Sequence, residues 1–162
     1  MPTVEVSDER ETKDPVVDLS RVKGAAAAVL SAEDRADAHL SVAVVDDPFI
    51  ADLHERFSGI PGATDVLAFP LGDDGHSHGS SGPPPLLGEV VVSVDTAARE
   101  ARERGLTTER ELLLYVMHGT LHLLGYDDHD PQERTRMHSR QEQLLEAFMS
   151  GTTSLSESGG LD

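Results

Sequence analysis

The sequence has no cysteine, only two lysines and few aromatic residues, and each of these scarcities limits what the protein can be. Without cysteine the chain forms no disulfide, offers no thiolate metal ligand and performs no thiol catalysis. Aromatic residues make up 4% of the chain, so the core has to consist largely of Val, Leu and Ala. No apolar run is long enough to span a bilayer, and the polar first residues do not resemble a secretory signal peptide. We therefore expect a cytoplasmic protein.

Positive charge is scarce as well. The chain has 13 Lys and Arg residues against 30 Asp and Glu residues, which gives a formal net charge of −17. Taken alone, this charge argues against nucleic-acid binding, because contacts with phosphate groups need cations. The alternative is an acidic surface adapted to high salt, since at molar ionic strength the Debye length is only ~3 Å and self-repulsion is screened. Both interpretations stay open, so the charge says little about the site.

Hydrophobic patterning predicts one α+β domain, a sheet covered by helices, over residues 1–149. The Val run near residue 90 is typical of a strand buried on both faces. Residues 72–85, rich in Gly, Ser and Pro, are expected to form a flexible loop, and residues 150–162 a disordered tail. The expected order is βαβαββααα, with strands at 3–7, 39–47, 64–72 and 86–95 and helices at 14–30, 47–59, 95–105, 107–125 and 130–149.

The helix expected at 107–125 is the most informative element. It begins with Thr107 or Thr108 as N-cap, and Glu109 or Glu111 is expected to be the acid of a capping box. Its remaining positions are apolar nearly all round, so we expect the helix to be buried.

Two histidines on this helix point to a metal site. His118 and His122 are four positions apart and therefore share one face. Two buried imidazoles need partners, because an unpaired buried polar group costs roughly 1–3 kcal/mol. A shared zinc ion satisfies both and leaves positions for a third ligand and a water molecule. Gly125 can turn the chain back at the helix end. The candidates for the third ligand follow this turn: Asp127, Asp128 and His129.

The alternative is a pair of core histidines with ordinary hydrogen-bond partners, which the glycine turn and the following acids disfavour. The spacing from His118 onward also resembles the H-E-x-x-H-x-x-G-x-x-H pattern of metzincin proteases. Gly119 stands where those enzymes carry their catalytic glutamate, so the sequence argues against peptide hydrolysis.

Three blocks of this sequence resemble the YbeY family of bacterial rRNA-maturation endoribonucleases. They are HGTLHLLGYDDH (118–129), which matches H-G-x-L-H-L-x-G-Y-D-H with one additional Asp, TDVLAFP (64–70) and LLGEVVVS (86–93). The blocks follow the family order within residues 38–149. The resemblance implies a mixed four-stranded sheet, one zinc ion per chain held by three side chains, and cleavage of single-stranded RNA. It also implies a role at the 3′ end of small-subunit rRNA, in ribosome quality control, and the small ribosomal subunit as partner.

The chain departs from the family pattern at the third ligand. The family places a histidine six residues after the second ligand, where this chain has Asp128 and then His129. Alignment through Met137 without a gap favours Asp128, whereas the preference of zinc for imidazole favours His129. We expect Asp128 to be the ligand, and Asp127 to orient a ligating histidine from outside the ligand set.

A second departure concerns substrate contacts. Many family members carry an arginine six residues before the Thr of TDVLAFP, where this chain has Ser58. Arg56 lies two residues earlier and could substitute, although a solvated surface arginine is the favoured interpretation. Thr64 and Asp65 could line the cleft beside the metal or cap the strand that they precede.

The sequence thus supports a hypothesis of zinc-dependent phosphodiester hydrolysis, in which His118 and His122 hold the ion and the zinc-bound water attacks. The general base is not identified by the sequence. Two alternatives remain: a non-catalytic ribosome-associated factor with a structural zinc, and, less favoured because of Gly119, a metalloprotease.

Overall fold

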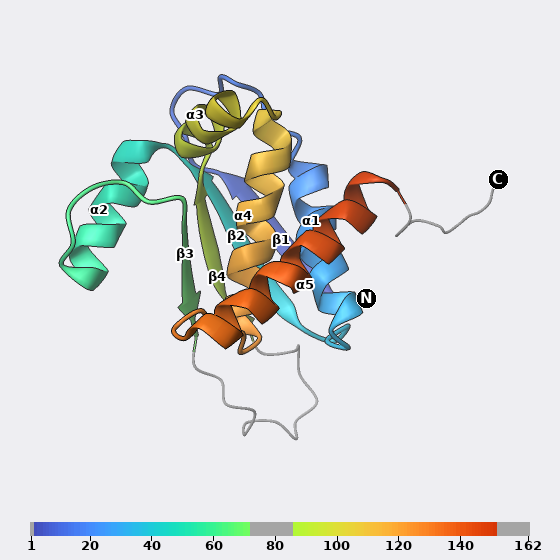
Figure 1. Ribbon diagram of the computed structural model, residues 1–162. Helices are drawn as coiled ribbons and strands as arrows, with labels where there is room; N and C mark the ends of the chain where they lie inside the picture. The colour runs from blue at the N-terminus through green and yellow to red at the C-terminus, as the bar shows by residue number, and fades with distance from the viewer. Residues whose placement is uncertain (1, 72–85, 152–162) are drawn as a thin grey trace.

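The computed structural model describes residues 2–71 and 86–151 and shows five helices and a four-stranded sheet in the expected order (Figure 1). The loop assigned to 72–85 lies outside the described residues, as does the tail beyond residue 151. In the described ranges, no helix is both long and apolar enough to cross a membrane. The elements are β1 (Thr3–Asp8), α1 (Leu19–Ala32), β2 (His39–Val45), α2 (Asp47–Ser58), β3 (Val66–Pro70), β4 (Leu86–Ser93), α3 (Val94–Arg104), α4 (Thr108–Leu123) and α5 (Pro131–Met149).

The sheet is mixed, which confirms the expected fold class. Its strand order is β1-β2-β4-β3, with β1, β2 and β4 parallel and β3 antiparallel to β4 at one edge. The β3–β4 ladder continues one step past β3, because the Ser93 amide donates to the Asp65 carbonyl at 3.0 Å. Residues that precede β3 are thereby held at the edge of the sheet next to α4.

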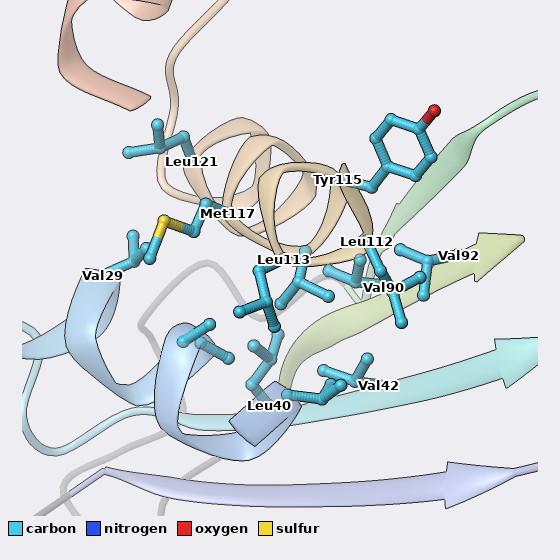
Figure 2. Close-up of a cluster of buried hydrophobic side chains, with 14 of the residues drawn as sticks. Val29, Leu40, Val42, Val90, Val92, Leu112, Leu113, Tyr115, Met117 and Leu121 are labelled. Atoms are coloured by element: carbon cyan, nitrogen blue, oxygen red, sulfur yellow. The ribbon is translucent and has the colours of Figure 1, made fainter. Parts of the chain in front are cut away.

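The core lies mainly between one face of the sheet and helices α1, α4 and α5 (Figures 1 and 2). Strand alternation divides the buried side chains: Val90 and Val92 of β4 face these helices, whereas Val91 faces α2 on the opposite side. Burial of the Val run on both faces is thus confirmed. As the composition implies, the core is built mostly from Val, Leu and Ala. Among the described residues, Tyr115 is the one buried aromatic side chain.

The start of α4 is capped by Thr107, whose hydroxyl oxygen accepts the Arg110 amide at 3.1 Å. The expected capping-box acid is wrong, because the position three residues after Thr107 is Arg110. Glu111 instead turns inward, with 2% of its surface exposed, and pairs with Arg104.

The end of α4 turns at Gly125, which has a φ of 105° that other residues rarely adopt. The Tyr126 amide donates back to the Leu121 carbonyl at 3.0 Å, the bond that closes a Schellman turn. The Tyr126 hydroxyl then donates to Glu33 at 3.0 Å, and Glu33 accepts Arg140 at 2.6 Å. The loop after Gly125 is therefore anchored to both α1 and α5.

Gly119 sets how closely α4 approaches the sheet. A Cβ atom added at Gly119 would lie 2.6 Å from Cγ1 of Val90 and 3.0 Å from Cγ2 of Val66. The first distance is too short for a real contact and the second is at the lower limit, so α4 can lie over β3 and β4 in this position only with glycine at the crossing. Glutamate at this position, as in the metzincin pattern, would not fit.

Replacing Gly119 with alanine should therefore destabilise the protein. Overpacking of this kind costs about 1–3 kcal/mol, whereas glycine to alanine in an unobstructed helix stabilises by roughly 0.5–1 kcal/mol. Urea unfolding measures the difference in the free energy of unfolding. Gly24→Ala in α1 is the matched control, since its Cβ would meet only the end of the Phe148 ring, at 3.2 Å. A Gly119→Ala variant as stable as the unaltered protein would contradict the close contact.

Candidate metal centre

An open cleft of about 500 Å³ lies between β3 and the C-terminal half of α4. One side is formed by residues 65–68 and Pro70, and the other by α4 and the loop that follows it. Because Gly119 has no side chain, α4 comes close to the sheet while the cleft in front of it stays open.

Three potential metal ligands meet in this cleft: His118, His122 and Asp128. One ligand atom from each lies within 4.8 Å of the other two, and Nε2 of His122 is 3.7 Å from Oδ2 of Asp128. The expectation of two buried imidazoles is wrong, since both are half-buried and the His122 side chain is 30% exposed. The apolar faces of α4 are buried in the core, but the histidine face lines the cleft. Solvent access is what a site for chemistry requires.

Of the two alternatives for the third ligand, the structure brings Asp128 to the histidines. His129 is 87% exposed, and its Nδ1 lies 2.9 Å from Oδ2 of Asp127. Asp127 also accepts the backbone amide of His129 at 3.1 Å, so it pairs with His129 and with neither cleft histidine. Ligation by Asp128 and an orienting role for Asp127 stay predictions.

Gln141 of α5 is a site residue that the sequence reasoning missed. Its side-chain oxygen lies 2.8 Å from Nδ1 of His118, and only 5% of its surface is exposed. An amide oxygen can only accept, so Nδ1 carries the proton and Nε2 keeps its lone pair for a metal. The sequence contains one indication of this role. Gln141 lies four residues after Met137, so a polar side chain falls on the apolar face of α5.

The electrostatics of the cleft favour the neutral form of His122. Burial and the neighbouring His118 lower the pKa of His122, and the carboxylate of Asp128 opposes this only in part. A neutral imidazole has the lone pair that a metal needs. Two imidazole nitrogens and one carboxylate oxygen are a donor set that zinc accepts, so the residues present fit the expected ion.

Asp65 combines both roles that the sequence left open. It lines the cleft, and its Oδ1 accepts the Val66 amide at 2.8 Å at the entry of β3. The hydroxyl of Thr64 donates to the same oxygen at 3.4 Å, and Thr64 is not among the described residues that line the cleft.

Arg56 and Ser58 lie on α2, outside the lining of the cleft. Arg56 is 63% exposed and pairs with Asp52 at 2.7 Å, as a solvated surface arginine does. The Ser58 hydroxyl donates to the His54 carbonyl at 2.6 Å. Contact of either residue with a substrate stays a prediction.

The fold and the cleft together define a class: α+β proteins that carry a histidine pair on a helix packed against a mixed sheet. Comparison with known proteins narrows this class. A sequence model of the family described as Endoribonuclease YbeY matches residues 6–149. The chain belongs to this family.

Similar proteins agree with this assignment. A protein of Beutenbergia cavernae named Endoribonuclease YbeY is 47% identical over 116 residues, which cover 70% of this chain and 77% of that protein. One of Anaeromyxobacter sp. with the same name is 44% identical over 127 residues, 78% of this chain and 63% of that protein. The solution structure of TM1509 from Thermotoga maritima aligns with a TM-score of 0.62 and 26% identity, covering 98% of this chain and 97% of that one.

Gln141 should matter for metal affinity. Gln141→Leu removes the acceptor that fixes His118, and loss of such an outer partner typically weakens metal binding by about 10–100-fold. Gln141→Glu keeps an acceptor oxygen and should retain most of the affinity. Competition with a chromophoric chelator measures the dissociation constant for zinc. Gln143→Leu, an exposed position on the same helix, is the control. Equal zinc affinity in all four proteins would contradict this role.

The third ligand can be identified by two matched substitutions in one loop. Asp128→Ala should reduce zinc binding strongly, because it removes a donor, whereas His129→Ala should leave the bound zinc per chain unchanged. Metal analysis of the purified variants measures the stoichiometry. Full zinc in Asp128→Ala together with loss in His129→Ala would show that the loop shifts by one residue to bind the ion.

Proposed function

We propose that this chain is a zinc-dependent endoribonuclease that cuts single-stranded RNA in the cytoplasm. The observation that carries the proposal is the meeting of His118, His122 and Asp128 in an open cleft, in a chain of a family described as an endoribonuclease. Maturation of the 3′ end of small-subunit rRNA, ribosome quality control and contact with the small ribosomal subunit are proposed on the family resemblance.

Zinc held by these three side chains supplies Lewis acidity, which activates water and polarises a phosphoryl oxygen. The donor set tunes this acidity. Two neutral imidazoles and one carboxylate leave a net charge near +1 around a divalent ion, whereas three imidazoles leave +2. We therefore expect a milder Lewis acid with Asp128 than with a third histidine.

The remaining parts of the proposed mechanism belong to the chain itself. Gln141 holds the His118 ring with its Nε2 available. The cleft of about 500 Å³ beside the ligands has room for a phosphate group. Asp65 uses one carboxylate oxygen for the Val66 amide, so its other oxygen can accept a proton in the cleft. We propose Asp65 as the group that receives the proton when a water oxygen attacks phosphorus, and that returns it to the ribose oxygen that leaves as the phosphodiester bond breaks.

The charge of the cleft connects the proposal with the acidic composition. Asp65 and Asp128 line the cleft, and none of the described lining residues is a lysine or arginine. Attraction of RNA phosphate then depends on the bound ion. Because the salt dependence of RNA binding grows with the number of phosphates neutralised by cationic side chains, we expect it to be shallow.

The decisive experiment incubates the zinc-loaded protein with single-stranded RNA, duplex RNA and casein, with and without a chelator. Only single-stranded RNA should be cleaved, and the chelator should stop cleavage. His118→Ala should lose more than about 100-fold in rate, since it removes a ligand rather than an outer partner. His54→Ala, a histidine of α2 that does not line the cleft, is the control.

The other outcomes separate the alternatives. RNA cleavage that persists in His118→Ala would exclude the metal mechanism. Intact RNA with stoichiometric zinc would support a non-catalytic ribosome-associated factor with a structural ion. Chelator-sensitive digestion of casein would identify a protease. Repeating the RNA assay at low and molar salt tests the expected shallow salt dependence.

A further inference from the structure

A second, smaller cavity adjoins the cleft on the other side of His118. Its volume is about 190 Å³, and it shares Asp65, Val66 and His118 with the cleft. Its remaining lining comes from the end of α3, the first half of α4 and the middle of α5. Drug-sized ligands need cavities of roughly 300 Å³ or more, so this one suits a single ring-sized group.

The cavity contains a buried hydroxyl without a partner. Tyr115 is 4% exposed, and its hydroxyl oxygen forms no hydrogen bond within the described ranges. Figure 2 shows this hydroxyl pointing away from the other labelled side chains of the hydrophobic cluster. Burial, and after it the charge and the close approach of the Glu111 carboxylate, raise the pKa of Tyr115, although the two side chains do not reach full hydrogen-bond geometry. A buried hydroxyl is costly when unpaired, so it suits a ligand that supplies the partner.

Glu111 provides a second polar group on the same wall. The carboxylate is 2% exposed, and its Oε2 accepts Arg104 at 3.2 Å. Arg104 is about half exposed and is shared with Glu100 at 3.4 Å. Its long side chain can therefore yield to an entering group, whereas Tyr115 and Glu111 are held by the core.

The charge of the lining excludes an anion. Asp65 and Glu111 outnumber Arg104, whose charge is already balanced by two carboxylates, so a phosphate group would be repelled. A flat group with both hydrogen-bond donors and acceptors fits better. A nucleobase has this character: its Watson–Crick edge places a donor beside an acceptor, which match the Glu111 carboxylate and the Tyr115 hydroxyl.

We propose that this cavity, the base pocket, receives one unpaired nucleobase of the RNA whose phosphate lies in the neighbouring cleft. This inference rests on the proposed function, because it takes the ligand of the cleft to be RNA. The two cavities are neighbours, because they share Asp65, Val66 and His118. A phosphate and a base of one RNA strand are neighbours in the same way.

The base pocket supplies a physical reason for acting on single strands. A base in a duplex has its Watson–Crick edge occupied and its faces stacked, so it cannot reach Glu111 and Tyr115. Proteins that read RNA commonly bind splayed bases of single strands in this way. The pocket also compensates for the missing cations, because hydrogen bonds to a base do not weaken with salt as phosphate contacts do.

The test uses the two tyrosines of the chain as probes. Protein made with 3-fluorotyrosine has two fluorine signals, and the Tyr126→Phe variant assigns them. The zinc-loaded protein is titrated with a single-stranded RNA hexamer, with hexamers that lack one base at successive positions, and with a duplex. All of these RNAs carry phosphorothioate linkages that resist hydrolysis, and electrophoresis checks that they stay intact. We expect the Tyr115 signal to shift with the intact hexamer, and not with the duplex or with one of the abasic hexamers. The Tyr126 signal is the internal control.

Affinity measurements complete the test. Tyr115→Phe removes only the hydroxyl and should weaken binding of the intact hexamer by about three- to tenfold, the usual range for one hydrogen bond. One abasic hexamer should leave the Tyr115 signal unmoved, because it lacks the base that enters the pocket. Tyr115→Phe should bind this hexamer as tightly as the unaltered protein does. Fluorescence anisotropy of labelled RNA measures both constants.

Each outcome decides the inference. A Tyr115 signal that stays unmoved at saturating RNA, equal shifts with every abasic hexamer, or no RNA binding at all would overturn the base pocket. Cleavage is measured separately on zinc-loaded protein. A shift without cleavage would keep the base pocket and overturn the nuclease, whereas cleavage without a shift would do the reverse.

Discussion

The contact between α4 and the sheet at Gly119 is the constraint on which the rest of the structure depends. The missing side chain lets the helix lie against Val90 and Val66, and this approach holds His118 and His122 beside strand β3. The same glycine stands where metzincin proteases place their general base. One residue therefore serves packing and chemistry together, since it brings the helix close and leaves no room for a glutamate.

The site is assembled from three directions around this contact. The helix α4 supplies the histidines, the turn at Gly125 returns Asp128 to them, and α5 supplies Gln141 from behind. The anchoring of Tyr126 to Glu33 and Arg140 ties the turn to α1 and α5, so the loop is held from both sides. A carboxylate that is to bind a metal needs a loop anchored in this way, because its side chain is not held in one orientation as the Gln141-bound ring of His118 is.

The net charge of −17 and the proposed RNA substrate are compatible once the cleft is considered by itself. No lysine or arginine lines the part of the cleft that the structure describes, so in the proposed function a bound ion would carry the attraction for phosphate. In the proposed base pocket, the buried Glu111 and Tyr115 would add recognition that does not depend on net charge. A family that acts on RNA can thus have a strongly acidic member without losing its site.

The sequence by itself determined the order of the elements, the α+β class, the paired histidines and the turning glycine. These features depend on local periodicity and on residue types that have few alternatives, such as glycine at a positive φ. Only the tertiary structure brought Asp128 rather than His129 to the histidines, opened their face to solvent, and joined His118 to Gln141 across 23 positions of the chain. The sequence also did not reveal that Glu111 pairs with Arg104. Its distance from the start of α4 suited a capping box as well as a buried ion pair. These outcomes depend on which helices pack together, and hydrophobic patterning specifies that a face is buried without specifying what meets it.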